Sequence, residues 1–246
     1  MVIGNWRLGF GSGPVHDRRA RRVTDRFTLA RTPGEMKQGL KRALSHVFWI
    51  GGSPCAGKSS IAKILVDKYK LQYYECDHQF GKHQARVVPD RRPAFHQLSR
   101  MSWDEIWMRP VPVQVAAEFD IYREEFEMIV EDLLALPGSP PILAEGAALL
   151  PDCVVEVLMN RRQAIWITPT EGFQRTHYPR RPWIQEILRQ CSEPQQAFQN
   201  WMDRDVAFAK QVAGRAAELG LALIKVDGMM TITETAAIAA NFFELH

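Results

Sequence analysis

The sequence feature that most constrains the fold is a short motif with two glycines and a lysine. Residues 52–59 read Gly-Ser-Pro-Cys-Ala-Gly-Lys-Ser and fit the pattern G-x-x-x-x-G-K-[ST]. An apolar run, Val47 to Ile50, precedes the motif and predicts a buried parallel strand. Ile61, Ile64 and Leu65 follow it at helical spacing. The order strand, loop, helix is the context that this motif requires, so the sequence predicts a phosphate-binding loop.

The chemistry of each position explains the pattern. Gly52 and Gly57 allow a tight turn and let the backbone approach phosphate oxygens without a Cβ in the way. Consecutive N–H groups at the start of the helix then face the negative charge. We expect Lys58 to reach the β- and γ-phosphates of ATP and the Ser59 hydroxyl to bind Mg²⁺. The predicted nucleotide-binding residues of this stretch are Gly52, Ser53, Pro54, Cys55, Ala56, Gly57, Lys58, Ser59 and Ser60.

Composition sets the frame for this motif. The chain has 246 residues, of which 46% are hydrophobic and 24% charged, which is enough for one sizeable α/β core. It contains no run of 18 uncharged apolar residues, so no membrane span is expected. The N-terminus lacks a continuous apolar segment, so no secretory signal is expected either. The four cysteines are widely spaced without a C-x-x-C pair. They predict free thiols, and we expect a cytoplasmic protein.

Positive charge is concentrated at the start of the chain. Residues 1–45 carry a net charge of +7, which leaves −4 for the remainder. Residues 1–35 have scattered glycines, an arginine cluster at 18–22 and no sustained periodicity, so we interpret 1–45 as a basic, flexible extension. A nucleic-acid or anionic-surface arm is one alternative, and an early start codon with Met36 nearer the true start is another. No aromatic residue is interleaved with the arginine cluster, so nucleic-acid binding is not expected.

Acidic residues follow two predicted strands. Leu71 to Cys76 predicts a second strand that ends at Asp77, and Pro141 to Gly146 predicts a third that contains Glu145. Open α/β sheets bind ligands at the carboxyl ends of their strands. We expect Asp77 to take or orient the proton of a substrate hydroxyl, or to hold Mg²⁺ through water; a helix N-cap or turn aspartate is the alternative. We expect Glu145, one methylene longer than the usual aspartate, to orient Mg²⁺ or water.

Residues 78–140 are expected to contact the substrate. His78 to Arg100 is polar and rich in arginine, histidine and proline, and no histidine pair has the i, i+4 spacing of a helical metal site. We interpret this stretch as a mobile region that faces an anionic group, with a solvated loop as the alternative. Ser102 to Glu105 then forms a capping box, and apolar residues at helical spacing predict a long helix from Val115 to Leu133.

A second arginine-rich stretch follows the fourth predicted strand, Ala164 to Thr168. Arg175, Arg180 and Arg181 lie within seven residues, which suits a lid over about 170–190 that clamps phosphates by charge-assisted hydrogen bonds. A solvated helix face is the alternative interpretation.

The end of the chain predicts one further long helix, one strand and a last helix. The long helix begins at Ser192 to Gln195 and ends at Gly220, and its Arg204 would bring another arginine to the phosphates. The strand covers Leu221 to Val226, and the last helix runs from Thr231 to Phe243.

Five apolar strands separated by helices, with the phosphate loop after the first, resemble the P-loop small-molecule kinase family over residues 46–246. This family includes nucleoside-monophosphate, shikimate and gluconate kinases and the chloramphenicol phosphotransferase group. The resemblance implies a three-layer α/β sandwich whose five-stranded parallel sheet has the order 2-3-1-4-5, with helices on both faces. It also implies that Asp77 is the substrate-side aspartate, that Arg175, Arg180 and Arg181 belong to the lid, and that Arg204 is the arginine on the next helix. The loop at Asp227-Gly228 would pack against adenine.

The expected function is an ATP- and Mg²⁺-dependent phosphotransferase that acts on a small hydroxyl- or phosphate-bearing metabolite. Lys58, Asp77 and the lid arginines are the expected catalytic residues, and Ser59 and Glu145 the metal ligands. The alternative is a regulatory module that binds or hydrolyses a nucleoside triphosphate without a small-molecule acceptor. The sequence names neither the acceptor nor the oligomeric state.

Cys55 carries a separate expectation. It lies inside the loop, beside a helix N-terminus and Lys58, and both features favour a thiolate. We therefore expect alkylation to inactivate the protein and ATP to protect it; an inert buried thiol is the alternative.

Overall fold

Five parallel strands form the centre of the protein. The computed structural model describes residues 33–246. The strands are β1 (Val47–Gly52), β2 (Gln72–Glu75), β3 (Ile142–Glu145), β4 (Ala164–Pro169) and β5 (Ala222–Val226). They form one sheet in the order β2-β3-β1-β4-β5, and every neighbouring pair is parallel. The predicted three-layer α/β sandwich with a parallel sheet of strand order 2-3-1-4-5 is confirmed.

Helices connect successive strands and account for most of the remaining described residues. They are α2 (Pro33–Ala43), α3 (Lys58–Tyr69), α4 (Cys76–Ala85), α5 (Pro93–Leu98), α6 (Trp103–Trp107), α7 (Val111–Ala135), α8 (Pro151–Val155), α9 (Glu171–His177), α10 (Pro182–Leu188), α11 (Pro194–Glu218) and α12 (Ile232–Phe242). Short 3-10 turns lie at η1 (Arg161–Gln163) and η2 (Tyr178–Arg180).

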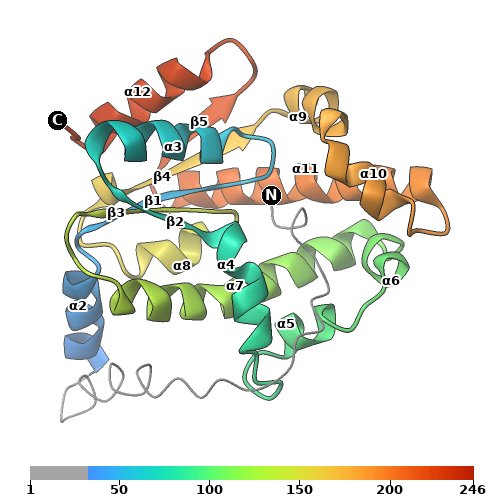
Figure 1. Ribbon diagram of the computed structural model, residues 1–246, viewed down its shortest axis with the longest axis horizontal. Coiled ribbons are helices and arrows are strands. Elements are labelled where there is room, and N and C mark those ends of the chain that lie inside the picture. Colours follow the sequence, from blue (N-terminus) through green and yellow to red (C-terminus); the bar gives the residue numbers. More distant parts are fainter. Residues whose placement is uncertain (1–32) are drawn as a thin grey trace.

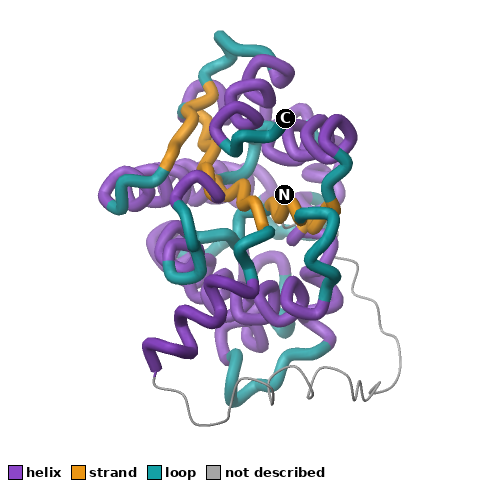
Figure 2. The backbone as a smooth tube through the Cα atoms, turned by 90° about the vertical axis from the view of Figure 1, so that its left-hand side faces the viewer, coloured by secondary structure: helices purple, strands orange, loops and turns teal. Residues whose placement is uncertain are grey.

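The helices form a layer on each face of the sheet (Figure 1). Helices α3 and α12 cover one face, where Ile50, Ile61 and Ile165 belong to an apolar cluster. Helices α7, α8 and α11 cover the other face, where Trp49 and Trp166 belong to a larger cluster. The view turned by 90° shows the strands between the two helical layers (Figure 2). Because β1 is central in the sheet and covered by helices on both faces, its side chains are apolar on both sides, which explains the apolar run in the sequence.

The register of the sheet gathers the strand ends that matter for function. Ile50 of β1 pairs with Glu145 at the end of β3, and Glu145 pairs in turn with Glu75 at the end of β2. On the other side of β1, Gly52 pairs with Ile167. The phosphate-loop motif and the acidic ends of β2 and β3 therefore share one edge of the sheet.

The interpretation of residues 78–100 as a mobile or solvated stretch was wrong for most of its length. This stretch contains the greater part of α4 and all of α5, and Phe80, Phe95 and Leu98 are buried. The helices were missed because His83 and Arg92 are also buried, so polar residues occupy core positions. Their partners lie on α7, far away in the sequence.

The predicted N-terminal extension includes a helix. Residues 1–32, with the arginine cluster, lie outside the described residues. Residues 33–43 were expected to be flexible but form α2, with Pro33 at its start, Glu35 in the first turn and Lys41 and Arg42 in the last turn. Leu40 on this helix packs against the core.

The cysteines and the lengths of the helices can be examined over the whole of residues 33–246. All four cysteines lie in it as free thiols, as predicted. None of the helices in residues 33–246 combines the length and the apolarity that crossing a membrane requires.

Candidate active site

The phosphate-loop motif forms a tight turn between β1 and α3. Gly52 has φ 129° and Gly57 has φ 77°, values that L side chains rarely adopt. A Cβ on Gly52 would lie 1.9 Å from the carbonyl oxygen of Ile167 on β4. The glycine at 52 is therefore required both by the backbone angle and by the closeness of the neighbouring strand.

Lys58 is the first residue of α3, and its side chain is buried. Its Nζ donates to the carbonyl oxygen of Ser53 at 2.9 Å and lies 3.9 Å from Oε1 of Glu145. The ammonium group thus lies between the Ser53 carbonyl of the loop and Glu145 at the end of β3. A buried lysine of this kind is a preorganised positive charge.

The groups around Glu145 shift the pKa of its carboxyl group in opposite directions. Burial raises the pKa of its carboxyl group, and the charge of Asp77 raises it further, while Lys58 and a hydrogen bond from Ser59 lower it. Tyr73 Oη donates to its Oε2 at 3.2 Å. The structure therefore brings together four predicted site residues: Lys58, Ser59, Asp77 and Glu145.

Asp77 lies at the same edge but on a different element from the one predicted. The strand β2 ends at Glu75, and Asp77 is in the first turn of α4. The aspartate is buried, and its charge acts on Glu145 of β3 and on Tyr122 of α7. It lies between the sheet edge and the helices of residues 78–140.

Glu75 and His78 were not singled out in the sequence. Glu75 is buried, and Nδ1 of the exposed His78 lies 3.0 Å from its Oε2. The signal for Glu75 was its position two residues before Asp77 at the end of a strand.

The three lid arginines differ in their surroundings. The guanidinium of Arg181 lowers the pKa of Cys55 in the loop and lies over the Tyr178 ring, 4.9 Å from its centroid. Arg175 instead pairs with Glu171 at 3.0 Å and with Asp203 at 2.6 Å. Arg180, at the end of η2, is exposed.

Arg204 on α11 is buried and compensated. Its Nε lies 3.3 Å from Oε2 of Glu118, and its Nη2 lies 2.5 Å from Oδ1 of Asp205. Its guanidinium covers the Trp107 ring at 4.7 Å from the centroid. With two carboxylates and an aromatic ring around it, Arg204 has little charge left to offer a phosphate.

The expectation of a reactive Cys55 was wrong in its chemistry. Burial raises the pKa of the Cys55 thiol, and the charge of Asp205 raises it further. Arg181 and Lys58 lower the pKa, but not enough to reverse the effect of burial. The position beside a helix N-terminus and a lysine was visible in the sequence, whereas burial was not.

A cavity of about 40 Å³ lies between α4, α5, α6, α7 and α11. Its polar lining includes Arg204, which was predicted as a site residue, and three residues that were missed in the sequence: Arg109, Gln114 and Glu118. Burial and the nearby Arg204 lower the pKa of Arg109, whose buried Nε has no hydrogen-bond partner among the described residues. Burial, with the charge of Asp205, raises the pKa of Glu118 to about 7 despite Arg204 and a hydrogen bond from Tyr122.

The residues of the loop fit ATP with Mg²⁺. The buried Ser53 hydroxyl has no hydrogen-bond partner among the described residues, and the turn at Gly57 leaves no Cβ at the helix start. Ser59 and Glu145 carry oxygen atoms of the kind that Mg²⁺ prefers, and they would hold the metal beside the phosphates. Within residues 33–246, no cluster of three or more His, Cys, Asp and Glu is arranged to hold a metal. Mg²⁺ commonly needs only one or two protein ligands when phosphates supply the others.

No family model and no curated protein sequence matches this chain. Among solved structures, the chain is similar to shikimate kinase from Aquifex aeolicus, with 12% identity and a TM-score of 0.33. That alignment covers 80% of this chain and 96% of the kinase. The chain is also similar to NadR protein in complex with NR, with 13% identity and a TM-score of 0.39 over 84% of this chain and 54% of NadR. At these identities the similarity concerns the fold alone.

Proposed function

We propose that this protein is an ATP- and Mg²⁺-dependent phosphotransferase that acts on a small hydroxyl- or phosphate-bearing metabolite. The observation that carries the proposal is the position of the Lys58 ammonium, between the Ser53 carbonyl and Glu145, at the edge where Asp77 also lies. Bound MgATP would supply the phosphoryl group and the charge that the metal neutralises.

The chain's own residues have distinct roles in this proposal. Lys58 and the backbone N–H groups of Ser53 and of residues 55–59 hold the phosphates, and Ser59 and Glu145 hold the metal. Asp77 orients the acceptor hydroxyl and accepts its proton. Arg181, the lid arginine whose charge acts on Cys55 of the loop, stabilises negative charge on the transferred group.

The cavity beside Arg109 is the proposed site for one end of the acceptor. It shares Tyr122 with the surroundings of Asp77, since the Asp77 charge raises the pKa of Tyr122, a cavity residue. The Nε of Arg109 offers an unused donor. The Oε1 of Gln114, another residue of the lining, is an unused acceptor, fixed because Nε2 donates to the carbonyls of Trp107 and Arg109 at 3.0 and 2.8 Å.

The alternative is a regulatory module that binds a nucleoside triphosphate and uses hydrolysis as a timer. Such a module needs neither a carboxylate placed for an acceptor nor a cavity near it. Asp77 and the cavity at Arg109 therefore favour the phosphotransferase.

The test has two stages. Calorimetry should detect MgATP binding to the full chain. Incubation with ATP and fractionated metabolite extracts, followed by mass spectrometry, should then reveal a phosphorylated small molecule whose formation requires both ATP and active protein. MgATP binding and hydrolysis without any phosphorylated acceptor would favour the regulatory module, and absence of MgATP binding would contradict both.

A further inference from the structure

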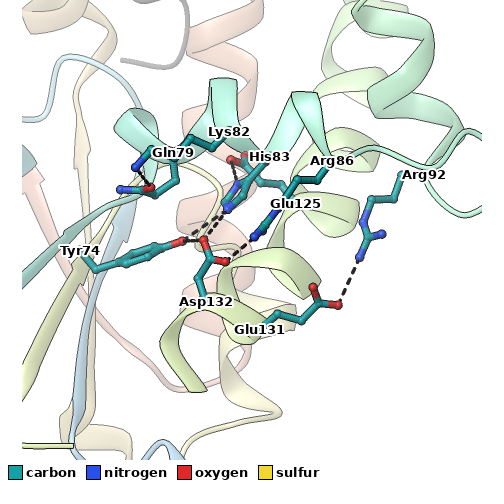
Figure 3. Close-up of polar contacts among 9 residues, drawn as sticks. All are labelled: Tyr74, Gln79, Lys82, His83, Arg86, Arg92, Glu125, Glu131 and Asp132. Atoms are coloured by element: carbon teal, nitrogen blue, oxygen red, sulfur yellow. Dashed lines mark hydrogen bonds and ion pairs between the residues drawn. The ribbon is translucent and has the colours of Figure 1, made fainter. Parts of the chain in front are cut away.

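A buried histidine joins the helix of Asp77 to α7. His83 is on α4 and has no exposed surface. Its Nδ1 lies 3.0 Å from Oε1 of Glu125, and its Nε2 lies 3.0 Å from Oδ2 of Asp132 (Figure 3). Both carboxylates are on α7, two turns apart on one face. One imidazole ring thus links α4 to two successive parts of α7.

The surrounding groups complete the cluster. Tyr74 of β2 donates to Oδ2 of Asp132 at 3.0 Å, and Arg86, the C-cap residue of α4, donates to Oδ1 at 2.9 Å. Asp132 is therefore held by Tyr74, by His83 of α4 and by the residue that caps α4 (Figure 3).

The geometry requires one extra proton in this cluster. Ionised carboxylates only accept hydrogen bonds, and a neutral imidazole has only one N–H to donate. Two carboxylates facing both ring nitrogens are satisfied when the ring is an imidazolium, or when Glu125 keeps the proton and donates it to the ring. With that proton the charges of His83, Arg86, Glu125 and Asp132 cancel. Without it the cluster carries a buried, uncompensated negative charge, which is costly.

The electrostatics agree with this geometry. Burial alone lowers the pKa of His83, but hydrogen bonds to Asp132 and Glu125, with their charges, raise it above the ordinary value of 6.5. Burial raises the pKa of Glu125, and the charge of Asp77 adds to this, while His83 lowers it. The other titratable groups that face the cluster are Tyr74 of β2 and Cys76 of α4, both held neutral by pKa values raised through burial.

The cluster lies on the same short helix as the proposed proton acceptor. Asp77 is in the first turn of α4, and His83 is in its last turn. The α4–α7 contact at His83 therefore fixes the orientation of the whole helix, and with it the direction from which Asp77 approaches the phosphate loop. A displacement of about 1 Å at such a position can cost roughly 10²-fold in rate.

We propose that the His83 latch, meaning His83 held between Glu125 and Asp132, positions Asp77 for phosphoryl transfer and releases it when the cluster loses its proton. The positioning role rests on the proposed function, whereas the latch itself does not. His83 is a positioning residue: it acts through α4 and touches no reacting atom. The sign follows from the raised pKa of His83: the stabilising contact is complete below pH 6.5 and is lost as pH rises through the higher, folded-state value.

The latch can be tested without nucleotide. In protein labelled with ¹⁵N-histidine, the ring signals of His83, assigned by their loss in His83→Gln, should titrate above pH 6.5. Amide exchange of residues 76–85, corrected for its intrinsic pH dependence, should accelerate over the same pH range. His83→Gln should accelerate it at every pH, whereas His96→Gln, a matched change at a partly exposed histidine on α5, should not. Unchanged exchange in His83→Gln would overturn the latch.

The link to Asp77 is tested by turnover once an acceptor is found. Glu125→Gln keeps an oxygen acceptor for the ring but removes a charge, so the alkaline fall of kcat should move to lower pH by about 1–3 units. Glu127→Gln, an exposed change on the same helix, should leave that profile in place. His83→Gln should lower kcat by roughly 10- to 100-fold while the MgATP affinity stays near that of the unchanged protein.

The outcomes separate the two proposals. Faster exchange of α4 with an unchanged pH profile of turnover in both variants would overturn the role in positioning Asp77. Absence of phosphoryl transfer by the unchanged protein would overturn the proposed function, and the positioning role with it, while the titration and exchange results would still decide the latch. If His83→Gln fails to fold, Glu125→Gln supplies both readouts.

Discussion

The Lys58 ammonium lies 3.9 Å from a carboxylate oxygen of Glu145, and both side chains are buried. The two residues come from different strand–helix units and meet because β1 and β3 are neighbours in the sheet. The positive charge therefore has a fixed position before any ligand binds.

Replacing Lys58 by alanine should remove most of the phosphate-binding charge. We expect Lys58→Ala to lower turnover by about 10²-fold or more, the usual loss when a preorganised charge is removed from a transition state. Lys63, exposed on the same helix, provides the matched control, and Lys63→Ala should behave as the unchanged protein. Turnover and MgATP calorimetry are the measurements, with circular dichroism to verify the fold. Near-normal turnover of Lys58→Ala would contradict the nucleotide site.

Replacing Asp77 by asparagine distinguishes a proton acceptor from a metal ligand. A positioned base contributes about 10²–10⁴-fold, so Asp77→Asn should lower acceptor phosphorylation by that factor. MgATP affinity, measured by calorimetry, should change little because the amide keeps the shape of the side chain. If MgATP binding weakens as much as turnover, Asp77 belongs to the metal shell and the role of proton acceptor is wrong.

The lid arginines should not be equivalent. The charge of Arg181 acts on Cys55 of the loop, whereas Arg180 is exposed. We expect Arg181→Gln to lower kcat at saturating ATP more than Arg180→Gln does, because only the first charge is placed beside the phosphates. The two variants differ by one position in the chain and have the same chemistry, so each controls for the other. Equal losses of kcat in the two variants would contradict this difference and would mean that the lid moves before phosphoryl transfer.

Cys55 should react slowly with alkylating reagents near neutral pH. Only the thiolate reacts, and burial raises the pKa of Cys55, so the thiolate fraction at pH 7 is smaller than for an ordinary cysteine. The rate of iodoacetamide modification, followed by mass spectrometry, should rise steadily with pH and remain below that of N-acetylcysteine at pH 7–8. MgATP should slow it further. A rate above that of N-acetylcysteine would show that Arg181 and Lys58 outweigh burial.

Two glycines should respond to alanine in opposite directions. At Gly52 a Cβ would lie 1.9 Å from a backbone oxygen, so Gly52→Ala should sharply lower the melting temperature. Gly214 is exposed within α11, and a Cβ there meets nothing within 4 Å. Gly214→Ala should therefore raise the free energy of unfolding by about 0.5–1 kcal/mol, the difference in helix propensity. Urea unfolding of both variants provides the comparison, and a stabilised Gly52→Ala would contradict the loop geometry.

The sequence alone determined the fold and the nucleotide side of the site. The phosphate-loop motif needs a strand before it and a helix after it, and both are local patterns of apolar residues. Parallel strands end at one edge of the sheet, so the placement of Asp77 and Glu145 beside Lys58 followed from chain order once the topology was inferred. The strand order, which was implied by the resemblance to the P-loop small-molecule kinases, is confirmed. The strands, the loop and the helix after it were readable because each depends on neighbours in the sequence.

Only the tertiary structure decided which charges are free to act. Arg204 is compensated by the adjacent Asp205 and by Glu118 of α7, Cys55 is partly buried, and His83 is held by two carboxylates of another helix. Apart from Asp205, these partners are distant in the sequence, and a titratable group changes its behaviour with burial and with charges a few ångströms away. The same cause hid α4 and α5: a histidine that is buried because distant carboxylates pair with it looks, in the sequence, like a residue of a solvated loop.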